Sequence, residues 1–175
     1  RLSALQSGGH FLVMRHAATD HTRKDYDRSF DASCTQQRDV SDQGRKDMER
    51  LRHSLAALDI QIDKVYSSPY CRCKHTAELA FGAYQVEKDL RFSISEAGAE
   101  AKRLAAFLIE LIRNSEMGRG NVVIVSHSSN IHDSIGVWPQ EEGVVWLKDP
   151  EGVYLGCNTR FEEFFGAREA EILGK

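Results

Sequence analysis

The sequence of 175 residues contains only three prolines, four cysteines and two tryptophans. Four cysteines are too few for a fold held together by disulfides alone in a chain of this length. The net charge is only -3, and no long basic run is present, which argues against a general affinity for nucleic acid. The longest apolar runs, such as 122–125, are as long as a strand and too short to span a membrane. We therefore expect neither a nucleic-acid partner nor membrane insertion.

The remaining composition is that of an ordinary folded domain. Hydrophobic residues make up 41% of the chain and charged residues 28%, values that exclude intrinsic disorder and collagen-like repeats. A chain of this length buries a sizeable core without help. No internal repeat or linker divides it, so we predict a single domain over residues 1–175.

Short apolar segments alternate with amphipathic helices along the chain. Ser41 is predicted to cap a helix whose apolar positions are Met48, Leu51, Leu55 and Leu58. A second helix is predicted to start at Ser68-Pro69 and to stop at Gly82, and a third covers 101–112. Strands are predicted at 11–14, 64–67, 85–90 and 121–126, and a hairpin at 144–147 and 153–155. This alternation predicts an α/β three-layer sandwich with a mostly parallel central sheet and helices on both faces.

Residues suited to binding an oxyanion follow three of the predicted strands. Arg15-His16 follow the strand 11–14, and Arg72 lies in the first helical turn after the strand 64–67. Ser126-His127 stand at the end of the strand 121–126. Because ligands bind beyond the carboxyl ends of parallel strands, we expect these side chains to converge. The helix start at Pro69 adds backbone N–H donors. The sequence therefore predicts an anion site at this edge of the sheet.

The residue types at this site favour phosphoryl chemistry. Arginine presents forked donors that match phosphate oxygens, and two arginines spread the charge of a transferring phosphoryl group. A histidine attacks phosphorus only as neutral imidazole, and nearby arginines lower its pKa and keep it neutral. The site needs no metal and no cofactor on this interpretation.

Three segments carry a resemblance to a known family: FLVMRHAATD at 11–20, VYSSPYCRCKHTAE at 65–78 and NVVIVSHSSNI at 121–131. In order and spacing they resemble the histidine phosphatase superfamily, also called the phosphoglycerate-mutase-like fold. The resemblance implies that His16 is the nucleophile, with Arg15 and Arg72 on the phosphate. It also implies that His127 completes the pocket and stabilises the transition state. Ala17 stands where most members have glycine.

The resemblance implies a metal-independent hydrolase of phosphomonoesters or phosphoramidates that forms a phosphohistidine on His16. Its substrate is expected to be a small phosphorylated molecule or a phosphoprotein. Phosphoglycerate-mutase-type transfer is one alternative, and a noncatalytic phosphate-binding module is another. Gly8-Gly9, the segment 34–44 and Cys71-Arg72-Cys73 resemble small bacterial members that are often exported, so we expect a periplasmic or secreted protein, with the cytoplasm as the alternative.

Three further residues are weaker candidates. Thr19 matches a phosphate-binding position of the family, although capping of its loop explains it equally well. Arg38 lies in the long polar loop 19–40, where a substrate-binding or a solvated side chain fits. Glu96, within 90–97, is a loose match to the family's proton donor.

The cysteines allow two further hypotheses. Cys71, Cys73 and His75 form a ligand-rich cluster, but residues two apart on a helix point in nearly opposite directions, so we predict no metal site. If the loop folds over the pocket, Cys34 approaches Cys71 closely enough to form a disulfide, which requires an oxidising compartment. The alternative is four reduced thiols.

Overall fold

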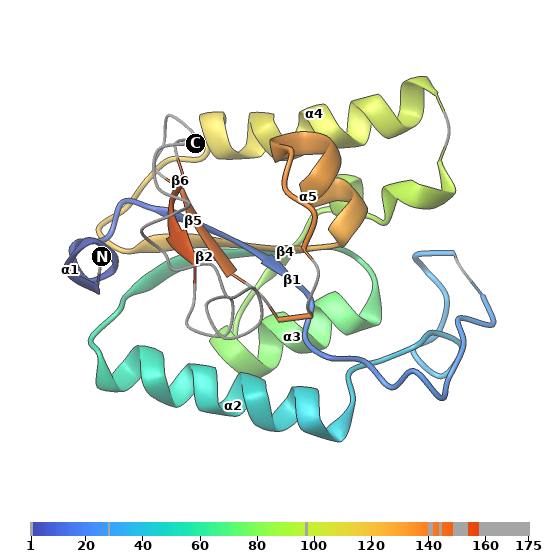
Figure 1. Cartoon of the computed structure of the whole chain (residues 1–175), viewed down its shortest axis with the longest axis horizontal. Helices are drawn as coiled ribbons and strands as arrows, with labels where there is room; N and C mark the ends of the chain where they lie inside the picture. The colour runs from blue at the N-terminus through green and yellow to red at the C-terminus, as the bar shows by residue number, and fades with distance from the viewer. Residues whose placement is uncertain are drawn as a thin grey trace.

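The centre of the protein is a six-stranded sheet with the strand order β3-β2-β4-β1-β5-β6 (Figure 1). The computed structural model describes residues 2–27, 29–96, 98–139, 142–143, 145–148 and 154–157. Neighbours among the first four strands pair in parallel, and a hairpin of the last two adds to them antiparallel. The strands are β1 (Phe11–Arg15), β2 (Ile62–Ser67), β3 (Gln85–Val86), β4 (Asn121–Ser126), β5 (Val145–Lys148) and β6 (Tyr154–Cys157). The predicted mostly parallel sheet is thus confirmed.

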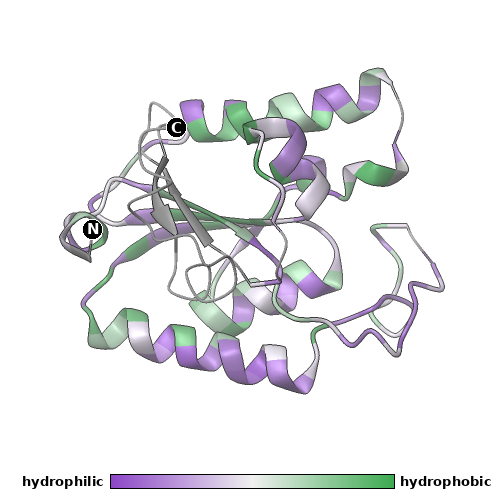
Figure 2. Cartoon of the chain, viewed as in Figure 1, coloured by the Kyte–Doolittle hydropathy of each residue, from purple (hydrophilic) through white to green (hydrophobic). Residues whose placement is uncertain are grey.

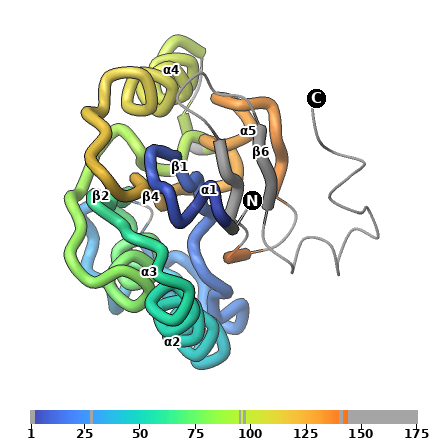
Figure 3. The backbone as a smooth tube through the Cα atoms, turned by 90° about the vertical axis from the view of Figure 1, so that its left-hand side faces the viewer, coloured from blue at the N-terminus to red at the C-terminus, as the bar shows by residue number. Residues whose placement is uncertain are grey.

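Helices cover both faces of this sheet, as predicted (Figures 1 and 3). Helices α2 (Asp42–Ala57) and α3 (Cys71–Phe81) lie on one face, and α4 (Ala99–Asn114) and α5 (Ser128–Ile135) lie on the other. A short helix α1 (Leu2–Ser7) precedes β1, and the 3-10 turns η1 (Lys88–Leu90) and η2 (Ser93–Ser95) precede α4. In the described part of the chain, no helix has the length and apolar character needed to cross a membrane.

The central strand β4 supplies both halves of the core. Val122 and Ile124 pack with Leu108 of α4 on one face, and Val123 and Val125 pack on the other face in a cluster that includes residues of α3. All four β4 residues are fully buried. Successive side chains of a strand point to opposite faces, so a strand covered on both sides is apolar throughout. The hydrophobic colouring of the inner strands in Figure 2 shows this pattern.

Several predicted ends differ from the structure, and two of them have a clear physical reason. The strand predicted at 85–90 stops at Val86, because the chain then turns through η1 and buries Leu90. Helix α3 begins at Cys71 with Tyr70 as its N-cap, and the predicted cap, Ser68, uses its hydroxyl on another partner. Two other ends agree with the prediction: Ser41 accepts a hydrogen bond from the Gly44 N–H at the start of α2, and α3 stops at Gly82.

Candidate active site

Arg15, His16, Arg72 and His127 come together at the carboxyl edge of the parallel strands, as the sequence predicted. The rings of His16 and His127 lie 5.6 Å apart between centroids. Both histidines and Arg72 are at most 3% exposed. Because little water reaches these buried side chains to screen them, the charge of each arginine strongly affects the protonation of the histidines.

The contacts of His16 fix which of its ring nitrogens carries the proton when the ring is neutral. The His16 backbone N–H donates to the Ser126 carbonyl, 3.1 Å away, which ties β1 to the end of β4. The Nδ1 atom lies 3.0 Å from the Ala17 carbonyl oxygen, which only accepts, so Nδ1 carries the proton. The Nε2 atom of the neutral ring therefore keeps its lone pair, as a nucleophile requires.

The pKa of His16 lies well below its usual value of 6.5. Burial is the largest cause, followed by the positive charge of Arg72, with smaller effects of Arg15 and Arg38. A hydrogen bond to the Ala17 carbonyl acts in the opposite direction. The sequence predicted the effect of the arginines, but burial contributes more.

The second histidine is held by a different set of contacts. The Ser68 hydroxyl lies 2.8 Å from His127 Nε2 and accepts from the Tyr70 N–H, so its own proton is available for Nε2. His127 Nδ1 then carries the ring proton, and it is buried without a hydrogen-bond partner among the described residues. Burial, Arg72 and His16 lower the pKa of His127, in that order. The ring is thus a neutral donor suited to an oxyanion.

Aromatic rings hold the Arg72 guanidinium. Its Cζ lies 4.8 Å from the Tyr70 ring centroid and 5.7 Å from that of Phe92. Both rings also pack on His127, with centroids 5.1 and 5.2 Å away. Arg72 Nη1 lies 3.3 Å from the Asp25 carboxylate, while its buried Nε has no described hydrogen-bond partner. A donor therefore remains for a phosphate oxygen.

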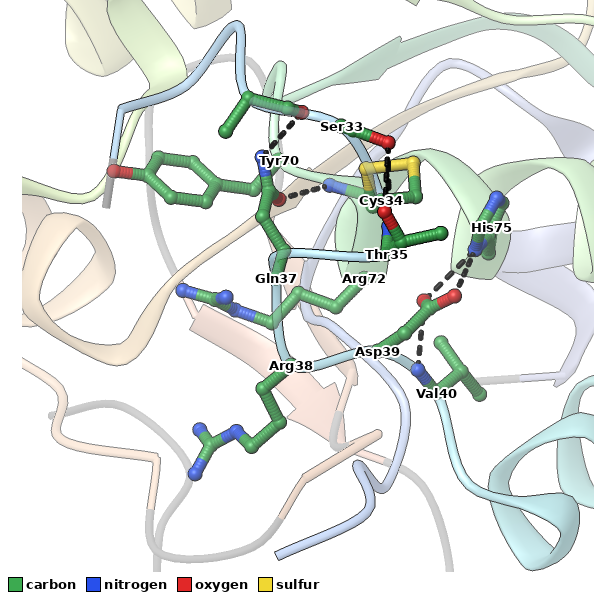
Figure 4. Close-up of a disulfide and its surroundings, with 12 residues drawn as sticks. Ser33, Cys34, Thr35, Gln37, Arg38, Asp39, Val40, Tyr70, Arg72 and His75 are labelled. Atoms are coloured by element: carbon green, nitrogen blue, oxygen red, sulfur yellow. Dashed lines mark hydrogen bonds and ion pairs between the residues drawn. A yellow bond between two sulfur atoms is a disulfide. The ribbon is translucent and has the colours of Figure 1, made fainter. Parts of the chain in front are cut away.

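A disulfide between Cys34 and Cys71 fastens the long loop to the start of α3 (Figure 4), which confirms the predicted pairing. The fully buried Gln37 adds a second attachment, because its side-chain oxygen accepts from the Cys71 N–H at 2.9 Å. The next residue, Arg38, bonds through its backbone N–H to Asp25 at 2.7 Å. Its guanidinium Nη1 lies 3.1 Å from His21 Nδ1, and its charge makes a smaller contribution than that of Arg72 to the lowered pKa of both histidines.

The ligand-rich segment of α3 is divided among separate partners. Cys71 is in the disulfide, Cys73 lies 3.6 Å from His127 Nε2, and His75 pairs with Asp39 at 2.7 Å. Burial raises the pKa of the Cys73 thiol to about 12. Within the described ranges, no group of three or more potential ligands is arranged to hold a metal ion.

Thr19 and Arg15 both contact a residue that the sequence analysis did not identify, Glu142. The Thr19 N–H and hydroxyl donate to the two carboxylate oxygens at 2.7 and 2.9 Å. Arg15 Nη2 lies 3.2 Å from the same carboxylate, and Nη1 donates to the Pro139 carbonyl at 3.3 Å. Nothing in the local sequence marks Glu142, because these partners lie more than 120 residues earlier.

Glu96, the predicted proton donor, is more exposed than Glu142 and is paired with another arginine. Its carboxylate is one third exposed and is 3.4 Å from Arg91 Nε, and Arg91 also pairs with Asp89 and Glu100. Its negative charge contributes to the raised pKa of Tyr70, after the larger effect of burial. Glu96 is therefore paired with Arg91, and its charge acts on the Tyr70 side of the site.

Comparisons with known proteins identify the family and the fold of this chain. The family model described as "Histidine phosphatase superfamily (branch 1)" matches residues 11–100. Among solved structures, the protein histidine phosphatase SixA in complex with tungstate aligns with TM-score 0.59 and 15% identity over 85% of this chain and 95% of its own. A phosphoglycerate mutase from Thermus thermophilus aligns with TM-score 0.60 and 13% identity, over 85% and 97%. The open reading frame Rv3214 product of Mycobacterium tuberculosis gives 0.56 and 17%, over 79% and 89%. No curated protein matches the chain.

Replacing both Cys34 and Cys71 by serine is expected to lower the free energy of unfolding by about 2–4 kcal/mol, because the unfolded loop is no longer closed. Urea unfolding with and without reductant measures this, and the double variant should not respond to reductant. Peptide mapping without reductant should recover the two cysteines in one crosslinked peptide from the unaltered protein. Equal stability of the two proteins under oxidising conditions would contradict the role of the bridge.

Proposed function

The chain belongs to the histidine phosphatase superfamily (branch 1), and from this premise we propose that it hydrolyses phosphomonoesters or phosphoramidates through a phosphohistidine on His16. The resemblance noted in the sequence is confirmed at the level of family and fold. The observation that carries the proposal is the position of His16: a buried ring whose Nδ1 lies 3.0 Å from the Ala17 carbonyl and whose pKa is lowered by burial and by the charges of Arg72, Arg15 and Arg38.

The reaction proceeds in two steps at His16 Nε2. The Nε2 lone pair attacks phosphorus, the N–P bond forms, and the bond to the leaving oxygen or nitrogen breaks with its electron pair. The Nδ1 proton stays hydrogen-bonded to the Ala17 carbonyl, so the phosphorylated ring carries a positive charge. Water then attacks phosphorus, the N–P bond breaks, and neutral His16 and inorganic phosphate are released.

The other site residues stabilise charge on the phosphoryl oxygens. His127 Nδ1 and the Nε atoms of Arg72 and Arg38 are buried donors without described partners, and an oxyanion satisfies all three. Positive charge comes from the arginines in this scheme, so no metal ion takes part. The carboxylates of Glu96 and Asp25 are both paired with arginines, so neither supplies a proton to the leaving group. Turnover then depends on a leaving group that departs readily without that proton.

We place the protein in an oxidising compartment, the periplasm or the exterior of the cell. The Cys34–Cys71 disulfide supports this proposal, because such bridges persist only where thiols are not kept reduced. Mutase activity is the second family reaction, and it differs in its product: a hydrolase releases inorganic phosphate from a phosphorylated acid, whereas a mutase returns an isomer of it.

His16→Ala is expected to abolish turnover and the covalent phosphoenzyme, because no nucleophile remains. His127→Ala and Arg72→Ala should keep the phosphoenzyme and lower kcat by about 10²–10³-fold, the effect of losing one preorganised donor. Release of 4-nitrophenol from its phosphate measures the rate, and the acid lability of the trapped phosphoenzyme identifies phosphohistidine. A near-normal rate in His16→Ala protein contradicts the proposed mechanism.

The acidic limb of kcat/KM is expected below pH 6.5, since His16 reacts when neutral and its pKa is lowered. Arg72→Gln removes the second-largest cause of that lowering, so the pKa of His16 rises and the limb moves to higher pH. Arg38→Gln, a smaller cause, should move it less. The pH profiles of the unaltered protein and the two variants are measured with the same substrate, so the titration of the substrate affects all three equally. An acidic limb that moves to lower pH in Arg72→Gln would disprove this account.

Activity is expected to survive exhaustive treatment with a chelator, because guanidinium groups supply the charge that a metal supplies elsewhere. Phosphate release before and after dialysis against EDTA tests this. Loss of activity that a divalent cation restores would refute a metal-independent mechanism.

A further inference from the structure

Glu142 lies against the nucleophile from a segment far away in sequence. Its carboxylate is only 9% exposed, and one of its oxygens is 3.9 Å from His16 Nδ1. Arg15 Nη2 and the two donors of Thr19 bind the same carboxylate, and His21 Nε2 is 3.4 Å away. The adjacent Gly143 N–H donates to the His16 carbonyl at 2.8 Å, so the segment is fastened to the nucleophile at two points.

The position of this carboxylate relative to the ring excludes a role as proton donor to the leaving group. Phosphorus binds Nε2, so the leaving atom lies beyond Nε2, whereas Glu142 makes its closest approach to Nδ1. The carboxylate oxygens also accept from Arg15 and Thr19, which is the bonding pattern of an acceptor. What Glu142 offers the reaction is a fixed negative charge.

We propose that Glu142 is a positioning residue whose charge stabilises His16 when the ring becomes phosphorylated, an inference that rests on the proposed function. In the resting protein the ring is neutral and gains little from a nearby carboxylate. After phosphorylation at Nε2, with the proton kept at Nδ1 by the Ala17 carbonyl, the ring is a cation 3.9 Å from that carboxylate. A charge interaction that exists only after the N–P bond begins to form lowers the barrier to forming it.

The same contacts hold two more parts of the site in place. Glu142 and the Pro139 carbonyl orient the Arg15 guanidinium from one loop, and Thr19 is fixed through both of its donors. Glutamine keeps nearly the same shape and one oxygen acceptor, so Glu142→Gln loses the charge together with the bonds to whichever oxygen its amide nitrogen replaces. Aspartate keeps the charge and shortens the side chain.

The first test is the rate of phosphoenzyme formation, measured as the burst of 4-nitrophenol in rapid-mixing experiments. Glu142→Gln should slow the burst about 100-fold and lower the amount of phosphohistidine at steady state. Glu142→Asp should recover part of the rate. Glu49→Gln, on the exposed face of α2, is the matched control and should behave as the unaltered protein. A burst that is unchanged or faster in Glu142→Gln overturns the proposal. A faster burst would indicate instead that Glu142 competes with phosphate for Arg15.

A second test does not require turnover, and it therefore distinguishes failure of this inference from failure of the proposed function. The pKa of His16, followed by NMR of the labelled imidazole, should be lower in Glu142→Gln than in the unaltered protein, because the cationic ring loses its anion. The other groups that face the ring or the carboxylate, which are the charged Arg15, Arg38 and Arg72 and the titratable His127 and His21, are the same in both proteins. An unchanged or higher pKa refutes the charge interaction, whatever the enzymatic activity. Thermal unfolding of both proteins shows whether the variant is folded.

Discussion

The constraint on which the site depends is the burial of positive charge beside two histidines. Arg72 is 2% exposed and is the first charged group among the causes that keep both imidazoles neutral. A guanidinium removed from water needs partners, and it finds them in the faces of Tyr70 and Phe92 and in the Asp25 carboxylate. The same burial lowers the pKa values of both histidines, so the environment that is costly for folding also favours the neutral imidazoles that the proposed mechanism needs.

Two loop carboxylates balance this charge from separate segments of the chain. Asp25 accepts from Arg72 and from the Arg38 N–H, and Glu142 accepts from Arg15 and Thr19. The loop 19–40 is polar in sequence, so its position depends on specific bonds. The disulfide and the Gln37 cap on α3 supply those bonds for the first loop. For the second loop, Glu142 itself and the Gly143 N–H supply them.

The parts of the fold that were predictable from the sequence are those governed by local chemistry. The run 122–125 indicated a strand buried on both faces, Ser41 indicated the start of α2, and Gly82 indicated the end of α3. The start of α3 was misplaced because Ser68 has a stronger use for its hydroxyl, the His127 ring, which is 59 residues away. The strand predicted at 85–90 failed because burial of Leu90 outweighed the strand-like pattern.

The site divides in the same way. His16, Arg72 and His127 follow strands, and the sheet topology alone brings strand ends together, so these residues could be found from the sequence. Glu142, Asp25 and Gln37 lie in loops and act through contacts with residues 34 to 127 positions away, which no local pattern records. The topology thus places the groups that are proposed to react, and the loop carboxylates balance their positive charge. Under the proposed mechanism, the residues at the sheet edge provide the catalytic ability. The preference among leaving groups depends instead on the loop carboxylates, which are paired with arginines.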